Sequence, residues 1–186
     1  MRWLPILAMT GAFAGVAGAA TEPERPPFPS IQLSDLSGQP MELKSLLGHA
    51  TVINFWATWC GPCRMELPEL QKLYNQMGGK GLVLLAVDVD MVPSEEGGIA
   101  ELLTLAKPRI DSVLGALGVT LPVYVVDGRT LAELSGLGLE QIPLTVLLDR
   151  EGRVVRLYPG YSAAGVADLR KQVAGVLAEA SGQGGK

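Results

Sequence analysis

The sequence contains few of the residues that mark several common protein classes. Only 5% of its 186 residues are aromatic and 18% are charged, with a formal net charge of -4. It has two cysteines and a single histidine, His49, and no cluster of lysine or arginine. The absence of a basic patch argues against binding to a nucleic-acid backbone. Two cysteines three positions apart do not supply the four ligands of a structural zinc site, so no metal site is expected.

Apolar residues, by contrast, are abundant, at 48% of the chain. This fraction and the length suffice for one globular domain with a core of Leu, Val, Ile and Ala. The first twenty residues differ from the rest. Arg2 precedes an apolar run over residues 3–16, and small residues follow at 17–20. Residues 1–20 are therefore interpreted as a secretory signal peptide, which predicts a periplasmic or other extracytoplasmic location. An uncleaved N-terminal anchor is the alternative, although the run is shorter than the ~20 residues of a membrane span.

Three prolines in residues 21–28 predict an extended linker with no reason to pack. The domain is expected to occupy residues 29–186 and to begin with a small hairpin formed by residues 31–33 and 41–43. Continuous apolar runs predict buried strands, and a helix between two of them makes a βαβ unit. The expected strands are 51–57, 82–89, 121–126, 144–148 and 153–158, and the expected helices are 64–77, 94–105, 110–117, 130–134 and 163–180. Pro108 is expected to separate the second and third of these helices.

Cys60 and Cys63 enclose Gly61 and Pro62 at the junction of a predicted strand and helix. A bridge across so small a loop adds little stability, and such bridges are typically labile or catalytic. The thiolate is the reactive form, and the unpaired N–H groups at a helix N-terminus stabilise it. Cys60 is therefore expected to attack substrate disulfides, and Cys63, one turn later, to resolve the mixed disulfide. Pro62 falls in the first turn, where its missing N–H costs nothing. An inert bridge and a copper(I) site remain alternatives.

The segment Phe55–Arg64, with the sequence FWATWCGPCR, resembles the active site of the thioredoxin superfamily. Pro68 matches the proline within the helix of that family, and Ile142-Pro143 resembles its cis-proline site. The segment Val146–Val154, together with the export signal and the hairpin, is similar to the exported TlpA/ResA/CcmG-like branch. The resemblance implies an α/β, thioredoxin-like three-layer fold, with a central mixed β-sheet flanked by helices. An N-terminal β-hairpin and an enlarged central insertion around residues 91–121 would be added to it.

The resemblance also implies roles for individual residues. Pro143 would be cis and face the cysteine pair, and the backbone of Ile142 would pair with an extended substrate. Trp59 would be a partly exposed aromatic residue beside the site, or would simply pack. Electrons would pass through the Cys60–Cys63 disulfide without a bound cofactor.

Two features depart from the thioredoxin pattern or extend it. Asn54 occupies the position at which thioredoxins have a buried carboxylate, and an amide cannot transfer a proton. The resemblance to the TlpA/ResA-like branch implies an acid near the end of the following strand, where Asp88 and Asp90 are the candidate acids or bases. A solvated position at the strand end is favoured for both, because aspartate at such positions is usually exposed.

The sequence thus predicts a monomeric protein-disulfide reductase acting on exported proteins, with apocytochromes c among its candidate clients. A membrane thiol donor of the DsbD/CcdA type would re-reduce it, since the exported compartment lacks a reducing buffer. A disulfide oxidase or isomerase that uses the same residues is one alternative. A non-catalytic copper(I)-binding module and a peroxidase are the others.

Overall fold

The computed structural model describes residues 25–90, 98–134, 136 and 141–182. Seven strands form one mixed sheet in the order β2-β1-β5-β4-β3-β6-β7. The elements are β1 (Gln32–Asp35), β2 (Pro40–Glu42), η1 (Leu43–Leu46), β3 (Ala50–Trp56), α1 (Gly61–Met77), η2 (Gly78–Lys80), β4 (Leu82–Asp88), α2 (Ile99–Leu117), β5 (Val123–Val125), α3 (Gly128–Leu134), β6 (Leu144–Asp149), β7 (Val154–Pro159) and α4 (Ala163–Gly182). The predicted strands are all present, with ends that differ by at most two residues.

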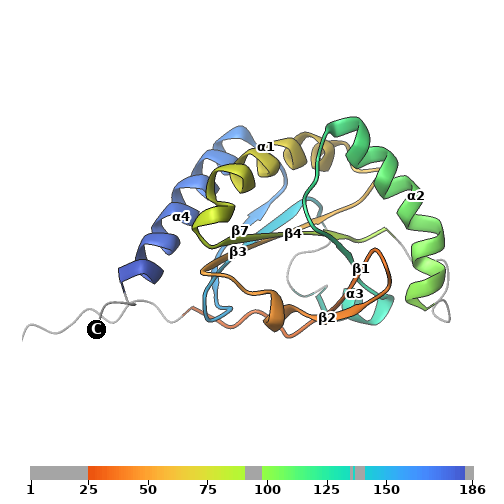
Figure 1. Cartoon of the computed structure of the whole chain (residues 1–186), viewed down its shortest axis with the longest axis horizontal. Coiled ribbons are helices and arrows are strands. Elements are labelled where there is room, and N and C mark those ends of the chain that lie inside the picture. The colour runs from red at the N-terminus through yellow and green to blue at the C-terminus, as the bar shows by residue number, and fades with distance from the viewer. Residues whose placement is uncertain (1–24, 91–97, 135, 137–140, 183–186) are drawn as a thin grey trace, which may run out of the picture.

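Helices cover both faces of the sheet. Figure 1 shows α1, α2 and α4 over one face and α3 on the other side. Strands β3, β4 and β5 run parallel, and β6 pairs antiparallel with β3. Residues of β3 and β4 are almost wholly buried, as expected for parallel strands covered on both faces. The predicted three-layer, thioredoxin-like fold is thereby confirmed.

The long helix α2 corrects one sequence-based expectation. Pro108 does not end a helix but lies inside α2. Leu102, Ala106, Ile110 and Leu114 recur every four residues and are buried, so the packed face continues past the proline. Thr104 and Pro108 lie on the exposed face, where solvent can hydrate the carbonyl that the proline leaves without a donor. Gly118, at φ +64°, then ends the helix in a left-handed conformation. Residues 94–97, expected to begin a helix here, lie outside the described residues.

The segment that enters the domain is packed more closely than predicted. Pro27 forms a β-bridge with Arg153, and Phe28 is buried and donates its backbone N–H to Gly152. The expectation of an unpacked linker is therefore wrong for residues 25–28, because Phe28 supplies an apolar side chain to the core. Residues 21–24 lie outside the described part of the chain.

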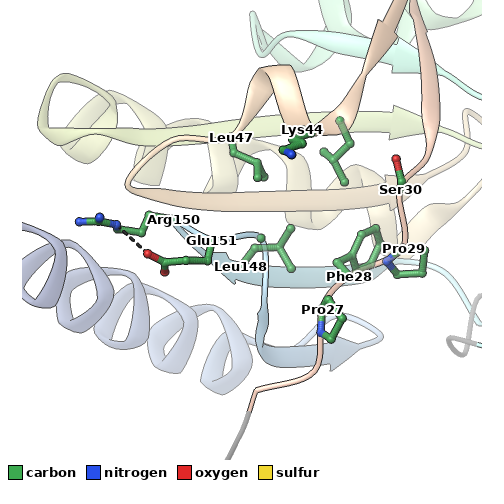
Figure 2. A pocket seen from close by; sticks show the side chains of 11 residues that line it. Pro27, Phe28, Pro29, Ser30, Lys44, Leu47, Leu148, Arg150 and Glu151 are labelled. Carbon is green, nitrogen blue, oxygen red and sulfur yellow. Dashed lines mark ion pairs between the residues drawn. The ribbon is translucent and has the colours of Figure 1, made fainter.

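This segment borders a cavity of about 420 Å³ at one end of the sheet. Figure 2 shows Phe28 and Leu148 on its wall, with the ion-paired Arg150 and Glu151 at one side. Leu148 lies near the end of β6, whereas Pro143 immediately precedes the start of that strand. The cavity is thus at the opposite end of β6 from the cis-proline site. Among the described residues, no helix is long and apolar enough to cross a membrane.

Candidate functional site

The cysteine pair lies where β3 gives way to α1. Cys60 is the N-cap of α1, with extended backbone angles, and Cys63 is buried in the first turn. The two are joined by a disulfide, and the backbone N–H of Cys63 donates to Cys60 Sγ at 3.2 Å. Pro62 stands in the first turn, where no helical partner for an N–H is lost. An N–H aimed at Cys60 Sγ is the contact that would stabilise a thiolate there.

The surface around the pair is exposed and partly apolar. Trp59 is 70% exposed and Met65 is 61% exposed, and Gly61 and Pro62 are exposed between them. Of the two expectations for Trp59, the structure supports the exposed aromatic residue and not the packed one. Cys60 itself retains only 4% exposure. A partner that reaches the Cys60 sulfur atom therefore meets a residue that is itself almost wholly buried, next to the exposed Trp59 in the chain.

The predicted cis-proline lies beside the pair. The Ile142-Pro143 peptide bond is cis, as expected, and Pro143 is buried. The carbonyl oxygen of Ile142 is 3.8 Å from Cys60 Sγ, although the two residues are 82 positions apart in the chain. The fold thus brings the two predicted halves of the site together. The proposed pairing of the Ile142 backbone with a substrate stays a prediction.

Sequence reasoning missed Glu66, which is buried one turn after Cys63. Asn54 Nδ2 donates to Glu66 Oε2 at 2.8 Å and to Thr145 Oγ1 at 2.8 Å, and Thr145 Oγ1 donates to Glu66 Oε1 at 3.2 Å. Burial raises the pKa of Glu66 to about 7, and the hydrogen bonds from Thr145 and Asn54 oppose that rise. A carboxyl that titrates near neutral pH is suited to proton transfer.

A signal for Glu66 was present in the sequence. Cys63, Glu66, Leu67 and Leu70 recur at helical spacing on one face of α1, and all four are buried. A charged residue within an apolar stripe of a helix is either a polar mismatch or a functional group. In the thioredoxin pattern the carboxylate is at the strand position, which is Asn54 here, whereas the carboxyl of this chain is that of Glu66 on the helix.

Asp88 and Asp90 are buried, at 1% and 7% exposure, so the favoured solvated position is wrong for both. The end of β4 is covered by the loop that leads from β3 to Cys60, where Thr58 contacts Asp90. Burial and, second, the charge of Asp90 raise the pKa of Asp88 to about 7, and the hydrogen bond from the Asp90 backbone opposes the rise. His49, the single histidine, is exposed before β3.

Comparison with known proteins places this arrangement among thiol–disulfide proteins. A model of the AhpC/TSA family matches residues 25–173. The thiol-disulfide oxidoreductase ResA of Bacillus thuringiensis (strain Al Hakam) is 32% identical over 127 residues, which are 68% of this chain and 64% of that relative. This chain therefore spans slightly less than two thirds of that relative's length. ResA of Bacillus subtilis (strain 168) is 30% identical over 144 residues, covering 77% of this chain and 72% of that protein.

A solved structure agrees with the fold. The thioredoxin-family thiol:disulfide interchange protein of Chlorobium tepidum TLS has a TM-score of 0.65 and 24% identity, covering 84% of this chain and 99% of that one. A likeness at this identity shows a shared fold. Together with the ResA relatives, it confirms the resemblance to the thioredoxin superfamily and its ResA-like branch.

Proposed function

The chain belongs to the AhpC/TSA family, and we propose that it is an exported thiol–disulfide oxidoreductase that reduces disulfides of exported proteins at Cys60 and Cys63. The observation that supports this most directly is the position of the pair. Cys60 caps α1, receives the N–H of Cys63 at 3.2 Å, and lies 3.8 Å from the Ile142 carbonyl oxygen. Such a site combines a stabilised thiolate with an adjacent stretch of backbone that can hold a partner chain.

The first chemical step is attack by the Cys60 thiolate on one sulfur atom of a client disulfide. A bond forms between Cys60 Sγ and that sulfur atom, and the client's own S–S bond breaks. The second client sulfur leaves as a thiolate and takes a proton. The exposed Trp59 and Met65 would lie against the client's apolar side chains, and the backbone around Ile142 would align its main chain.

The second step releases the reduced client. Cys63 loses its proton and attacks Cys60 Sγ, so that the Cys60–Cys63 bond forms and the first client sulfur leaves as a thiolate. We assign Glu66, one helical turn from Cys63, as the buried group that holds this proton. Two electrons pass from the dithiol to the client, whose two sulfur atoms take up the two protons.

The proposed electron donor and clients are inferred from the expected compartment and from the resemblance to the exported branch of the family. An exported reductase must be re-reduced from the membrane, which favours a thiol donor of the DsbD/CcdA type. Apocytochromes c, whose haem-binding cysteines must be reduced before haem attachment, are the proposed clients. Export itself rests on the signal-like residues 1–20, which lie outside the described residues.

Redox titration followed by trapping tests the proposal. Purified protein is equilibrated with dithiol buffers to obtain the potential of the pair, and a Cys63→Ser variant is expressed with its export signal. We expect a potential well below that of a strong oxidant and mixed disulfides through Cys60 with exported proteins. Potentials near -120 mV are those of strong oxidants, so such a value would support the oxidase alternative instead. Failure of Cys63→Ser to trap any exported protein would contradict the reductase role, and a Cys60→Ser variant provides the control.

A further inference from the structure

The short loop between β3 and α1 delivers Cys60 to the helix N-terminus, and it is tied to the end of β4. The backbone N–H of Thr58 donates to Asp90 Oδ1 at 3.0 Å, and Thr58 Oγ1 donates to Asp90 Oδ2 at 2.6 Å. Both oxygens of the Asp90 carboxylate thus accept hydrogen bonds from a single residue of the loop, Thr58. Thr58 is buried and stands two positions before Cys60. A charge-assisted pair of this kind fixes geometry more strongly than one neutral hydrogen bond.

Asp90 is itself held by Asp88. The backbone N–H of Asp90 donates to Asp88 Oδ1 at 3.0 Å, and the Val89 N–H donates to the Trp56 carbonyl at 2.8 Å. Asp88 is the last residue of β4 and pairs with Trp56 of β3. Its Oδ2 is buried and has no hydrogen-bond partner among the described residues. A buried carboxyl oxygen without a donor favours the protonated, neutral acid.

The protonation state of Asp88 depends on the charged and titratable groups of the elements packed around it. Trp56 flanks it from β3 and Val125 from β5, and neither carries a charge. Asp90, in its own segment, supplies the negative charge that acts on it. From α1, the titratable groups on the buried face are Glu66 and, when reduced, Cys63. The buried residues of α2 are apolar. Asp88 and Asp90 therefore form a compact pair of carboxyls beneath the Cys60 loop.

We propose that Asp88 and Asp90 are positioning residues of the cysteine site, with Asp90 fixing the Cys60 loop through Thr58 and Asp88 holding Asp90 in place as a neutral acid. The proposal rests on the exchange chemistry proposed above. It replaces a direct acid or base role for these two residues. When Asp88 ionises, two buried negative charges lie two residues apart, and their repulsion loosens the hold on Thr58.

A weaker hold on Thr58 affects the Cys60 sulfur atom because Cys60 is the N-cap of α1. The Cys63 N–H can stabilise a Cys60 thiolate only while Cys60 keeps its position at the N-cap. A loosened loop weakens that contact, so the thiol pKa of Cys60 rises. Because the reduced form then loses stabilisation, the potential of the pair becomes more negative.

Alkylation of the reduced protein by iodoacetamide as a function of pH tests the positioning claim. The first alkylation is followed by mass spectrometry, which needs no client. Thr58→Val keeps the shape of the side chain and removes the 2.6 Å bond to Asp90. One hydrogen bond is worth about a fivefold factor, so the midpoint of the profile should rise by about half to one pH unit. Thr58→Ser, which restores the hydroxyl, should return it. A Thr58→Val profile that overlays the parent would overturn the proposal.

Asp88→Asn tests the second element, since it keeps an acceptor for the Asp90 N–H and cannot ionise. The parent profile should be broader than a single titration, with a second step near pH 7, and Asp88→Asn should remove that step. Asp111→Asn, an exposed aspartate paired with Lys107 on α2, is the matched control and should leave the profile unchanged. If Asp88→Asn keeps the step and Glu66→Gln removes it, the role assigned to Asp88 is wrong. Loss of client reduction with an intact alkylation pattern would instead contradict the proposed function alone.

Discussion

Asn54 of β3 donates a 2.8 Å hydrogen bond to the carboxyl of Glu66 on α1, so strand and helix share one buried polar contact behind the cysteine pair. Thr145 of β6 closes the triangle with hydrogen bonds to both residues. The strand position lacks the carboxylate of thioredoxins, and the helix supplies one in its place. Because the amide of Asn54 donates to it, the Glu66 carboxyl is held in one orientation beneath the first turn of α1.

Replacing Glu66 with glutamine should slow the resolving step while leaving the first attack intact. The amide is nearly isosteric but cannot accept the proton of Cys63, and general acid–base groups contribute roughly a hundredfold or more. Decay of a preformed mixed disulfide, followed by stopped-flow fluorescence across pH, should be slower by about that factor and lose its inflection near pH 7. Glu69→Gln, a partly exposed residue paired with Lys72 on the same helix, is the control. An unchanged inflection in Glu66→Gln would contradict the proton role.

Changing Asn54 to aspartate should destabilise the protein in a pH-dependent manner. The substitution removes the amide donor and sets two buried carboxyls at hydrogen-bond distance, which can share one proton but cannot both ionise cheaply. The loss in the free energy of unfolding should be small at pH 5 and grow to about 2–3 kcal/mol at pH 8, which is the range for a lost hydrogen bond to a charged group. Urea denaturation of both proteins at the two pH values measures the difference. Equal losses at pH 5 and pH 8 would show that Asn54 and Glu66 are not electrostatically coupled.

Sequence patterns sufficed where local chemistry decides the structure. The apolar strands and the helix after the cysteines were predicted because each depends on a short period. The cis Ile142-Pro143 peptide was predicted from the resemblance to the thioredoxin superfamily. Glu66 was missed, and Asp88 and Asp90 were expected to be solvated, because the burial of all three depends on which distant segment covers them. Asp90 is buried and bonds to Thr58, which lies 32 positions earlier in the chain. Pro108 was misread for a similar reason, since the packed face of α2 outweighs the break in its hydrogen bonding.

The stability of the oxidised protein should fall as the pH rises from about 4 to about 7. Glu66 and Asp88 have ordinary pKa values of 4.5 and 3.8 and folded values of about 7. Between these pH limits the folded state binds more protons than the unfolded state. The contribution of the two protonated carboxyls to the free energy of unfolding is therefore complete below pH 4 and is lost as the pH passes 7. For Asp88 the difference between its ordinary and its folded pKa corresponds to at most about 4 kcal/mol of unfolding free energy.

Chemical denaturation of the parent and of Asp88→Asn at intervals from pH 4 to pH 8 measures this dependence. The variant should lose stability less steeply, because its amide has no proton to release. A parent curve that rises with pH over this window would contradict the raised pKa values of both carboxyls. Asp111→Asn, on the exposed face of α2, should follow the parent curve and so controls for a change in overall charge.

Replacing Trp59 should weaken the binding of clients and leave the stability of the fold almost unchanged. Its side chain is 70% exposed, so Trp59→Ala removes little buried surface and should change the free energy of unfolding by less than about 0.5 kcal/mol. A client chain that crosses the pair would cover the indole, and exposed aromatic residues at such sites commonly contribute more than 1 kcal/mol to binding. KM for a disulfide-bonded client peptide should therefore rise about five- to tenfold, whereas the rate with a small disulfide such as hydroxyethyl disulfide should not change. Leu105→Ala, at 44% exposure on α2, should alter neither rate nor KM. An equal loss with peptide and small disulfide would place the effect of Trp59 on the chemistry of Cys60 instead of on client contact.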